Sequence, residues 1–78
     1  MLYERSREIE NRLNTIVGLI QAGGQSTLTL AAALSISRPT ISRCIAALRE
    51  RGYSIRAVRD ADGWSYEIAA EPAPIPPG

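Results

Sequence analysis

Residues 35–52, with the sequence SISRPTISRCIAALRERG, constrain the fold more than any other part of the chain. They indicate a tight turn followed by a helix whose two faces differ in chemistry. At about 3.6 residues per turn, the helix has an apolar stripe formed by Ile41, Cys44, Ile45 and Leu48. The opposite side carries Pro39, Thr40, Arg43, Ala46, Ala47 and Glu50. The apolar stripe predicts a core contact, whereas the small residues, hydroxyls and arginines opposite suit either a helix that enters a DNA groove or a solvated scaffold helix.

Charge is segregated along the chain, although the net charge is only +1. Residues 13–36 carry no charge, residues 37–59 carry six arginines against one glutamate, and residues 60–78 carry four acidic residues. The basic block is thus confined to the amphipathic helix and the segment after it. This distribution is typical of nucleic-acid binders, because contacts with phosphates supply much of their affinity.

The composition argues against catalysis, a metal site and a membrane span. The chain has no histidine and one cysteine, so it lacks an imidazole for acid–base chemistry and a set of soft zinc ligands. No segment approaches the roughly 20 apolar residues that span a bilayer, and the charged start MLYERSREIE is unlike a signal peptide. Cys44 lies on the apolar stripe, which favours a core residue over a redox sensor. We therefore expect a soluble cytoplasmic protein that is not an enzyme and binds no cofactor or metal.

The length of 78 residues allows one domain. We expect it to cover residues 1–70 and to be followed by a disordered, proline-rich tail, residues 71–78, because the sequence EPAPIPPG forms neither helix nor strand. A chain of this size buries only about 60% of its unfolded surface, which favours a dimer. Residues 1–8 are either a flexible end or the start of a longer helix that packs on a second copy.

Apolar periodicity predicts two helices ahead of the basic one. The first runs from about Ser6 to Ala22, with an apolar stripe of Ile9, Leu13, Ile16, Val17 and Ile20, and ends at a pair of glycines. Ser26 is a favourable N-cap for a short second helix over residues 27–34, in which Leu30 and Leu34 are the expected core contacts. A turn over residues 35–37 then buries Ile36.

The start of the third helix has two interpretations. Ser37 is the better N-cap, but Pro39 disfavours helical dihedrals at Arg38 and would make Arg38 the cap. Gly52 ends this helix, because glycine accepts the left-handed conformation of a helix exit.

The pattern then changes to an alternation that predicts a hairpin. The strands are Tyr53–Arg59 and Trp64–Ala69, joined by a turn of sequence DADG over residues 60–63. The inward-facing positions are expected to be Tyr53, Ile55, Ala57, Trp64, Tyr66 and Ile68. We expect Trp64 and Tyr66 to cover the helices rather than to stack on bases or contact a partner.

Three helices followed by a hairpin, with a basic third helix, is the order of a winged helix-turn-helix. The run LAAALSISRPTISRCIAALRERGYSI resembles the amino-terminal DNA-binding domain shared by the biotin repressor and the DeoR-like "type 11" helix-turn-helix regulators. The similarity covers roughly residues 12–68. It implies an α+β fold of three helices and a two-stranded antiparallel β-hairpin wing.

The resemblance also implies a function, that of a sequence-specific regulator of transcription, such as a repressor, that binds double-stranded DNA as a homodimer. The helix at about 38–51 would lie in the major groove, and the hairpin would reach the flanking backbone or minor groove. Arg43 would bond a guanine, and Thr40 would touch a thymine methyl or a phosphate. The full set of expected DNA-binding residues is Ser37, Arg38, Pro39, Thr40, Ser42, Arg43, Arg56, Arg59, Thr27 and Thr29.

Some of these roles have alternatives. Arg56 and Arg59 would contact phosphates beside the groove, or remain solvated surface charges. Thr27 and Thr29, at the amino end of the second helix, would face a phosphate or only cap the helix.

The hairpin tip departs from the family pattern, because its turn carries Asp60 and Asp62 where a basic or glycine-rich tip would suit DNA better. An acidic wing allows an alternative function, namely a winged-helix protein–protein interaction module that does not bind DNA and uses its amino-terminal helix or wing on a protein partner. The resemblance does not extend to biotin or sugar binding, since no residue here matches such a site.

Overall fold

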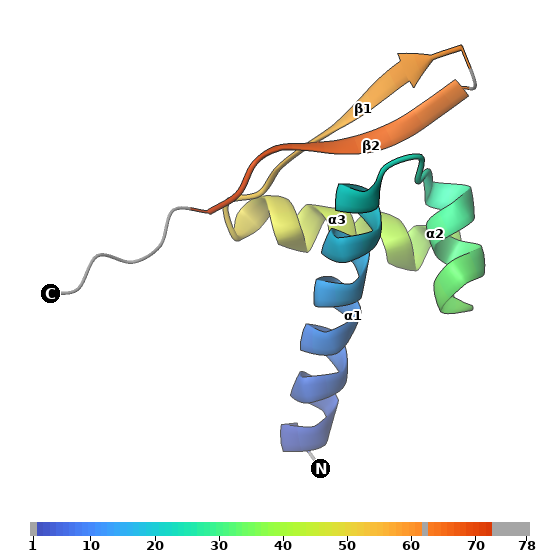
Figure 1. Cartoon of the computed structure of the whole chain (residues 1–78). Coiled ribbons are helices and arrows are strands. Elements are labelled where there is room, and N and C mark those ends of the chain that lie inside the picture. The colour runs from blue at the N-terminus through green and yellow to red at the C-terminus, as the bar shows by residue number, and fades with distance from the viewer. Residues whose placement is uncertain (1, 62, 73–78) are drawn as a thin grey trace, which may run out of the picture.

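The computed structural model describes residues 2–61 and 63–72 of the chain. Within these residues, the elements in chain order are α1 (Leu2–Ala22), α2 (Thr27–Leu34), α3 (Arg38–Glu50), β1 (Ser54–Asp60) and β2 (Gly63–Ala70). The two strands form an antiparallel hairpin. Figure 1 shows α1 crossing α3 steeply, α2 at one end of α3, and the hairpin above α3. The predicted α+β winged helix-turn-helix fold is confirmed.

Helix α1 is longer than the sequence periodicity predicts. It begins at Leu2 rather than near Ser6, so residues 2–8 are helical. From Arg7 onward, the first buried residue of α1 is Leu13, and Ile9 is 45% exposed. The amino-terminal half of α1 therefore projects from the rest of the fold (Figure 1).

Helix α2 starts where its cap predicts. The Ser26 hydroxyl accepts a hydrogen bond from the Thr29 backbone N–H at 3.2 Å, and the Thr29 hydroxyl accepts one from the Ser26 backbone N–H at 2.7 Å. This reciprocal capping box satisfies two N–H groups that the first turn of a helix leaves free. Ser35 ends α2 in a left-handed conformation with φ 56°, and Ile36, which was predicted to be buried, is half-buried against the core.

Of the two possible caps of α3, the structure selects Ser37. Its hydroxyl accepts a hydrogen bond from the Thr40 backbone N–H at 3.3 Å, and Arg38 is the first helical residue. The alternative, with Arg38 as the cap, is wrong. Pro39 fits the first turn because an N–H at that position has no partner within the helix.

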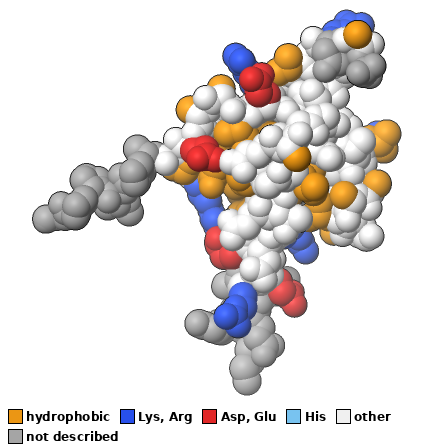
Figure 2. Space-filling view, viewed as in Figure 1, with side chains coloured by type: hydrophobic (Ala, Val, Ile, Leu, Met, Phe, Trp, Pro, Cys, Tyr) orange, Lys and Arg blue, Asp and Glu red, His pale blue; other side chains and the backbone are white. Residues whose placement is uncertain are grey.

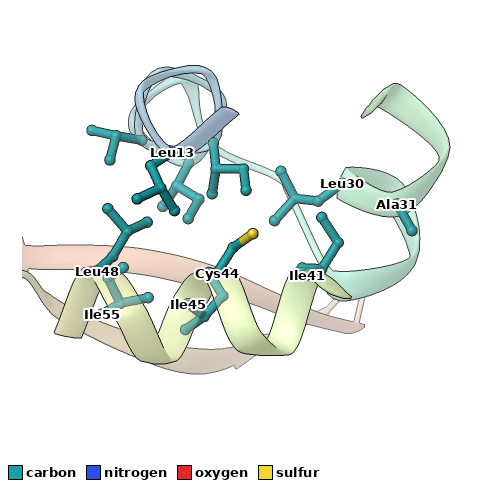
Figure 3. Packing of buried hydrophobic residues seen from close by; sticks show 11 residues of the cluster. Leu13, Leu30, Ala31, Ile41, Cys44, Ile45, Leu48 and Ile55 are labelled. Atoms are coloured by element: carbon teal, nitrogen blue, oxygen red, sulfur yellow. The ribbon is translucent and has the colours of Figure 1, made fainter. Parts of the chain in front are cut away.

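The core lies between α1 and α3, with α2 closing one end (Figure 3). Its buried residues are Leu13, Ile16, Val17, Ile20, Leu30, Ala31, Ile41, Cys44, Ile45, Leu48 and Ile55. The predicted apolar stripe of α3 is thus buried in full, and Cys44 is a core residue. The second predicted core contact of α2, Leu34, is half-buried and packs against this cluster.

The hairpin is fastened to the helices near its middle. The backbone N–H of Tyr66 donates to the carbonyl of Gln25, ahead of α2, at 2.7 Å. The Tyr66 and Thr27 hydroxyls are hydrogen-bonded at 2.8 Å. These contacts fix the angle between the wing and the amino end of α2.

Burial decreases along the hairpin from its base to its tip, which makes one prediction wrong. Ile55 is buried and pairs with the half-buried Ile68, but Trp64, on the same face near the tip, is 61% exposed. Ala57 is also exposed, between them. The alternation correctly placed Trp64 on the face of the hairpin that is turned toward the helices. The hairpin rises away from the helices toward its tip (Figure 1), so Trp64 stays exposed. The acidic residue Asp62 lies outside the described residues.

The first two residues of the expected tail contact the domain. The Gln21 amide donates a hydrogen bond to the Glu71 carboxylate, and Pro72 lies against the corner at Gly52. Residues 73–78 lie outside the described residues.

A side chain at Gly52, in the turn between α3 and β1, should destabilise the fold. Gly52 has φ +104°, and a Cβ built there would lie 3.1 Å from the Pro72 Cβ. We expect Gly52→Ala to lower the free energy of unfolding by about 1–2 kcal/mol, measured by urea denaturation.

A matched control is Gly18→Ala in α1, because a Cβ at this exposed position meets nothing within 4 Å. It should raise the free energy of unfolding by about 0.5–1 kcal/mol, since alanine favours the helix. Equal responses of the two variants would contradict the geometry of the Gly52 corner.

Candidate nucleic-acid interface

The outward face of α3 is open along its amino-terminal half. Arg38, Pro39, Ser42 and Arg43 are exposed, and Thr40 is half-buried. These are five of the expected DNA-binding residues, and the helix brings them together on one accessible surface because its apolar stripe is buried opposite them. Glu50, at the carboxyl end of α3, is exposed and would repel phosphates. The interface favoured by charge is therefore the amino-terminal half.

The six arginines of the basic block divide into two groups. Four are engaged within the molecule. Two form ion pairs: Arg51 with Glu10 of α1, and Arg56 with Glu67 across the hairpin at 3.2 Å. The Arg49 Nε–H donates a hydrogen bond to the Ile55 carbonyl at 3.0 Å. The Arg59 guanidinium lies over the Trp64 ring.

Arg38 and Arg43 form the second group, because neither has a hydrogen-bond or ion-pair partner among the side chains that the structure describes, those of residues 7–59, 61 and 63–72. Both are on α3. At about 100° per residue they lie roughly 140° apart around the helix axis, on its two flanks. The free positive charge of the basic block is therefore concentrated on both sides of one helix.

Each flank borders a hollow of about 340 Å³. One hollow, which we call the wing hollow, lies between α2, the start of α3 and the hairpin; its lining residues are Ser26, Thr27, Leu28, Arg38, Ala57, Trp64, Ser65 and Tyr66. The other lies between α1 and α3 and includes Arg43 and Thr40. Arg12 of α1 also lines this second hollow, together with Arg43. The sequence did not predict this, because the two residues are far apart in the chain and are brought together only by the packing of α1 on α3.

The hydroxyls of the expected site already have partners. Ser37 and Thr40 are hydrogen-bonded to each other at 2.8 Å, and Thr27 to Tyr66. Thr29 bonds Ser26 in the capping box. Thr29 thus caps α2 and Thr27 bonds the wing, while a contact of either threonine with a phosphate stays a prediction.

The two arginines of β1 differ in availability. Both Arg56 and Arg59 are exposed. The Arg56 guanidinium donates twice to one oxygen of Glu67, which neutralises it locally, although exposed ion pairs of this kind are weak. The guanidinium carbon of Arg59 lies over the Trp64 ring, 5.8 Å from its centroid, a cation–π contact that uses no hydrogen-bond donor. Arg59 is therefore the more available cation of the wing. In the view of Figure 2, basic and acidic side chains lie near one another at the edges of the molecule, and hydrophobic side chains are scattered between them.

One ion pair holds α1 against the end of α3. Arg51 donates from both terminal nitrogens to the Glu10 carboxylate, at 2.6 and 2.9 Å. These hydrogen bonds lower the pKa of Glu10 below its ordinary value of 4.5, and the same contact raises the pKa of Arg51. Both groups are largely exposed, so solvent screens the pair.

The Glu10 pair predicts a pH dependence of stability. Because the folded-state pKa of Glu10 is the lower one, its contribution is complete above pH 4.5 and is lost as the pH falls through the lowered pKa. We expect wild-type protein to melt slightly above Glu10→Gln at pH 7, and the difference in Tm to disappear in acid. Glu8→Gln, which removes a neighbouring exposed carboxylate, is the control; an equal pH dependence of both variants would rule out the pair as the cause.

Two further observations concern other classes of site. No helix within residues 2–61 and 63–72 combines the length and apolar character of a membrane span. The same residues contain no cluster of three His, Cys, Asp or Glu side chains arranged to hold a metal.

Comparison with known proteins places this geometry in a family. No curated protein and no solved structure matches the chain significantly. The sequence profile of a helix-turn-helix (HTH) domain, type 11, matches residues 12–65, which include the end of α1, the whole of α2 and α3, and most of the hairpin. The chain therefore belongs to the type 11 helix-turn-helix domain family, a family of DNA-binding regulatory domains.

Proposed function

We propose that this protein is a sequence-specific, double-stranded DNA-binding regulator of transcription, and that α3 lies in the major groove of its target. The observation that carries the proposal is the open amino-terminal half of α3, where Arg38 and Arg43 have no partner among the described residues while the other arginines of the block are engaged. A major groove is about 12 Å wide and admits one helix, so cations on both flanks of α3 would face the two bordering phosphate ridges.

The proposed roles follow from this orientation. Arg43 reads a guanine through O6 and N7, and Ser42, one residue away on the exposed face, bonds a base or a phosphate. Arg38 contacts a phosphate on the flank toward the wing. Thr40 and Ser37, which already share a hydrogen bond, contact DNA through their remaining lone pairs or fix the cap of α3.

The wing is proposed to contact the flanking DNA backbone. Arg59 is the stronger candidate for this contact, because Arg56 would first have to leave Glu67. We also propose that two copies act together in the cytoplasm, through the projecting amino-terminal half of α1, where Ile9 is exposed.

Titration of a fluorescein-labelled duplex in a salt series tests the function. The logarithm of the binding constant should fall linearly with the logarithm of the salt concentration, with a slope of about −0.9 per phosphate contacted. A slope near zero, or no binding at low salt, would refute DNA binding.

The double variant Arg38→Glu/Arg43→Glu provides the specific control, because both side chains are exposed and their reversal should leave the fold intact. It should abolish binding while the circular dichroism spectrum stays unchanged. Undiminished binding by this variant would place the DNA interface elsewhere on the molecule.

A further inference from the structure

The second hollow, which we call the α1–α3 hollow, has an apolar floor that belongs to the core. Leu13 of α1 and Cys44 of α3 are buried, and Ala47 of α3 is half-buried; all three line it. Its volume is about 340 Å³. Small-molecule sites in proteins are typically concave and mostly apolar, with a few polar groups that fix the ligand. The α1–α3 hollow has this form.

The polar part of the lining is basic. Three of the eight lining residues are arginines, and none is acidic. Arg51 is already paired with Glu10, which leaves Arg12 and Arg43. Arg12 has no hydrogen-bond or ion-pair partner among the described side chains, although Glu8 lies one turn away on the same helix. Two unpaired cations, one from each helix, therefore line the same hollow.

These cations narrow the class of ligand. Arg12 is half-buried, and a cation that is partly withdrawn from water is stabilised by a bound anion. The guanidinium group bonds a carboxylate through parallel N–H donors, a geometry that a point charge does not offer. An inorganic anion would leave the apolar floor uncovered, and a neutral hydrocarbon would leave the arginines unpaired. A carboxylate with a compact apolar body satisfies both parts of the lining.

We propose that the α1–α3 hollow binds a small aromatic or aliphatic carboxylate, with its apolar body on Leu13 and Ala47 and its carboxylate on Arg12 and Arg43. Arg43 is also the residue proposed to read a guanine. A carboxylate held between the two arginines neutralises Arg43 and turns it toward α1, so the ligand opposes DNA binding. This regulatory consequence rests on the proposed function, whereas the ligand site itself does not.

The binding experiment uses the full chain labelled with ¹⁵N, and cinnamate as the probe. Two-dimensional NMR resolves the side-chain Nε–H signals of arginines and so observes Arg12 and Arg43 directly. We expect cinnamate to shift both signals saturably, with a dissociation constant of about 0.1–1 mM, as for a ligand of this size in an open site. Cinnamamide, which has the same shape without the charge, and acetate, which has the charge without the ring, should bind much more weakly.

Variants test the two parts of the lining separately. Arg12→Gln removes one cation but keeps a long polar side chain, and should weaken cinnamate binding about tenfold. Ala47→Leu leaves all three arginines in place and fills part of the hollow, so it should weaken binding to a similar extent. Arg7→Gln makes the charge change at an exposed position of α1 outside the lining and should leave binding unchanged. Circular dichroism checks that each variant is folded.

Competition measures the effect on DNA. A fluorescein-labelled duplex about two helical turns long, selected from a random library by binding, is titrated with protein at several cinnamate concentrations. Fluorescence anisotropy of the label measures binding. If ligand and DNA exclude each other, the apparent dissociation constant for DNA rises by a factor of one plus the ratio of the cinnamate concentration to its own dissociation constant. Cinnamamide should leave it unchanged.

The outcomes are distinguishable. The ligand site is wrong if cinnamate does not shift the Arg12 and Arg43 signals saturably, or if cinnamamide or acetate binds equally well. It is also wrong if these signals shift on dilution of ligand-free protein, because a second copy then occupies the hollow. Cinnamate binding with unchanged DNA affinity would overturn the regulation alone. If the protein binds no duplex at low salt, the proposed function fails, and the NMR titration still decides the ligand site.

Discussion

Replacing Leu30 with alanine is expected to lower the free energy of unfolding by about 2–5 kcal/mol, the range for removal of a fully buried leucine. Leu30 is 0% exposed and points from α2 into the space between α1 and α3 (Figure 3). Helix α2 has eight residues, too few to be stable alone, and only Leu30 and Ala31 of it are buried. Since a domain of this size has a small margin of stability, the variant should be largely unfolded near physiological temperature.

The control is available in the same helix. Leu28→Ala makes the same chemical change two residues away, where the side chain is 64% exposed, and should alter the free energy of unfolding by less than about 0.5 kcal/mol. Urea denaturation followed by circular dichroism measures both variants. Similar stabilities of the two would mean that α2 is not held by Leu30.

The second large effect concerns recognition. Arg43→Ala is expected to cost about 1–3 kcal/mol of binding free energy for the preferred site and to relax the preference at one base pair. The reason is that a bidentate contact with guanine cannot be replaced by a water-filled gap without leaving base acceptors partly unsatisfied. Anisotropy titrations with the selected duplex, and with duplexes altered at single positions, measure both quantities.

Two further variants separate base reading from charge. Arg43→Lys keeps the positive charge but loses the planar fork, so the salt dependence should persist while specificity falls. Arg56→Ala removes one exposed charge from β1 and should weaken binding to all sequences alike, with specificity retained. The same pattern for Arg43→Ala would show that Arg43 contributes only general charge.

The structure also gives the engaged arginines a role in this recognition. The Arg51–Glu10 pair joins α1 to the end of α3, and the Arg49 hydrogen bond to the Ile55 carbonyl joins α3 to β1. Both contacts fix the angle of α3 against its neighbours. Arg49 and Arg51 belong to the basic block, but their contacts orient α3, the helix that carries Arg38 and Arg43.

Much of the fold could be predicted from the sequence, because its signals act over short distances. The burial of Ile41 and Leu48 follows from helical spacing, and the start of α2 at Ser26 follows from a hydroxyl three residues from the N–H it accepts. The choice between Ser37 and Arg38 as the cap of α3 was beyond this reasoning, since two local preferences of similar strength conflict there. The start of α1 was left open between a flexible end and a longer helix, because its first turns lack the regular apolar spacing; the structure has the longer helix.

The sequence by itself determined which elements form, which face of each is apolar, and that the basic residues cluster around α3, since these properties depend on residues within a few positions of one another. The tertiary structure alone decided which arginines remain free and where Trp64 lies. Glu10 and Arg51 are 41 positions apart, and their pairing depends on the angle at which α1 crosses α3. Trp64 is exposed because the hairpin rises away from the helices toward its tip (Figure 1), and that angle is set by packing and not by the alternation of the strand residues.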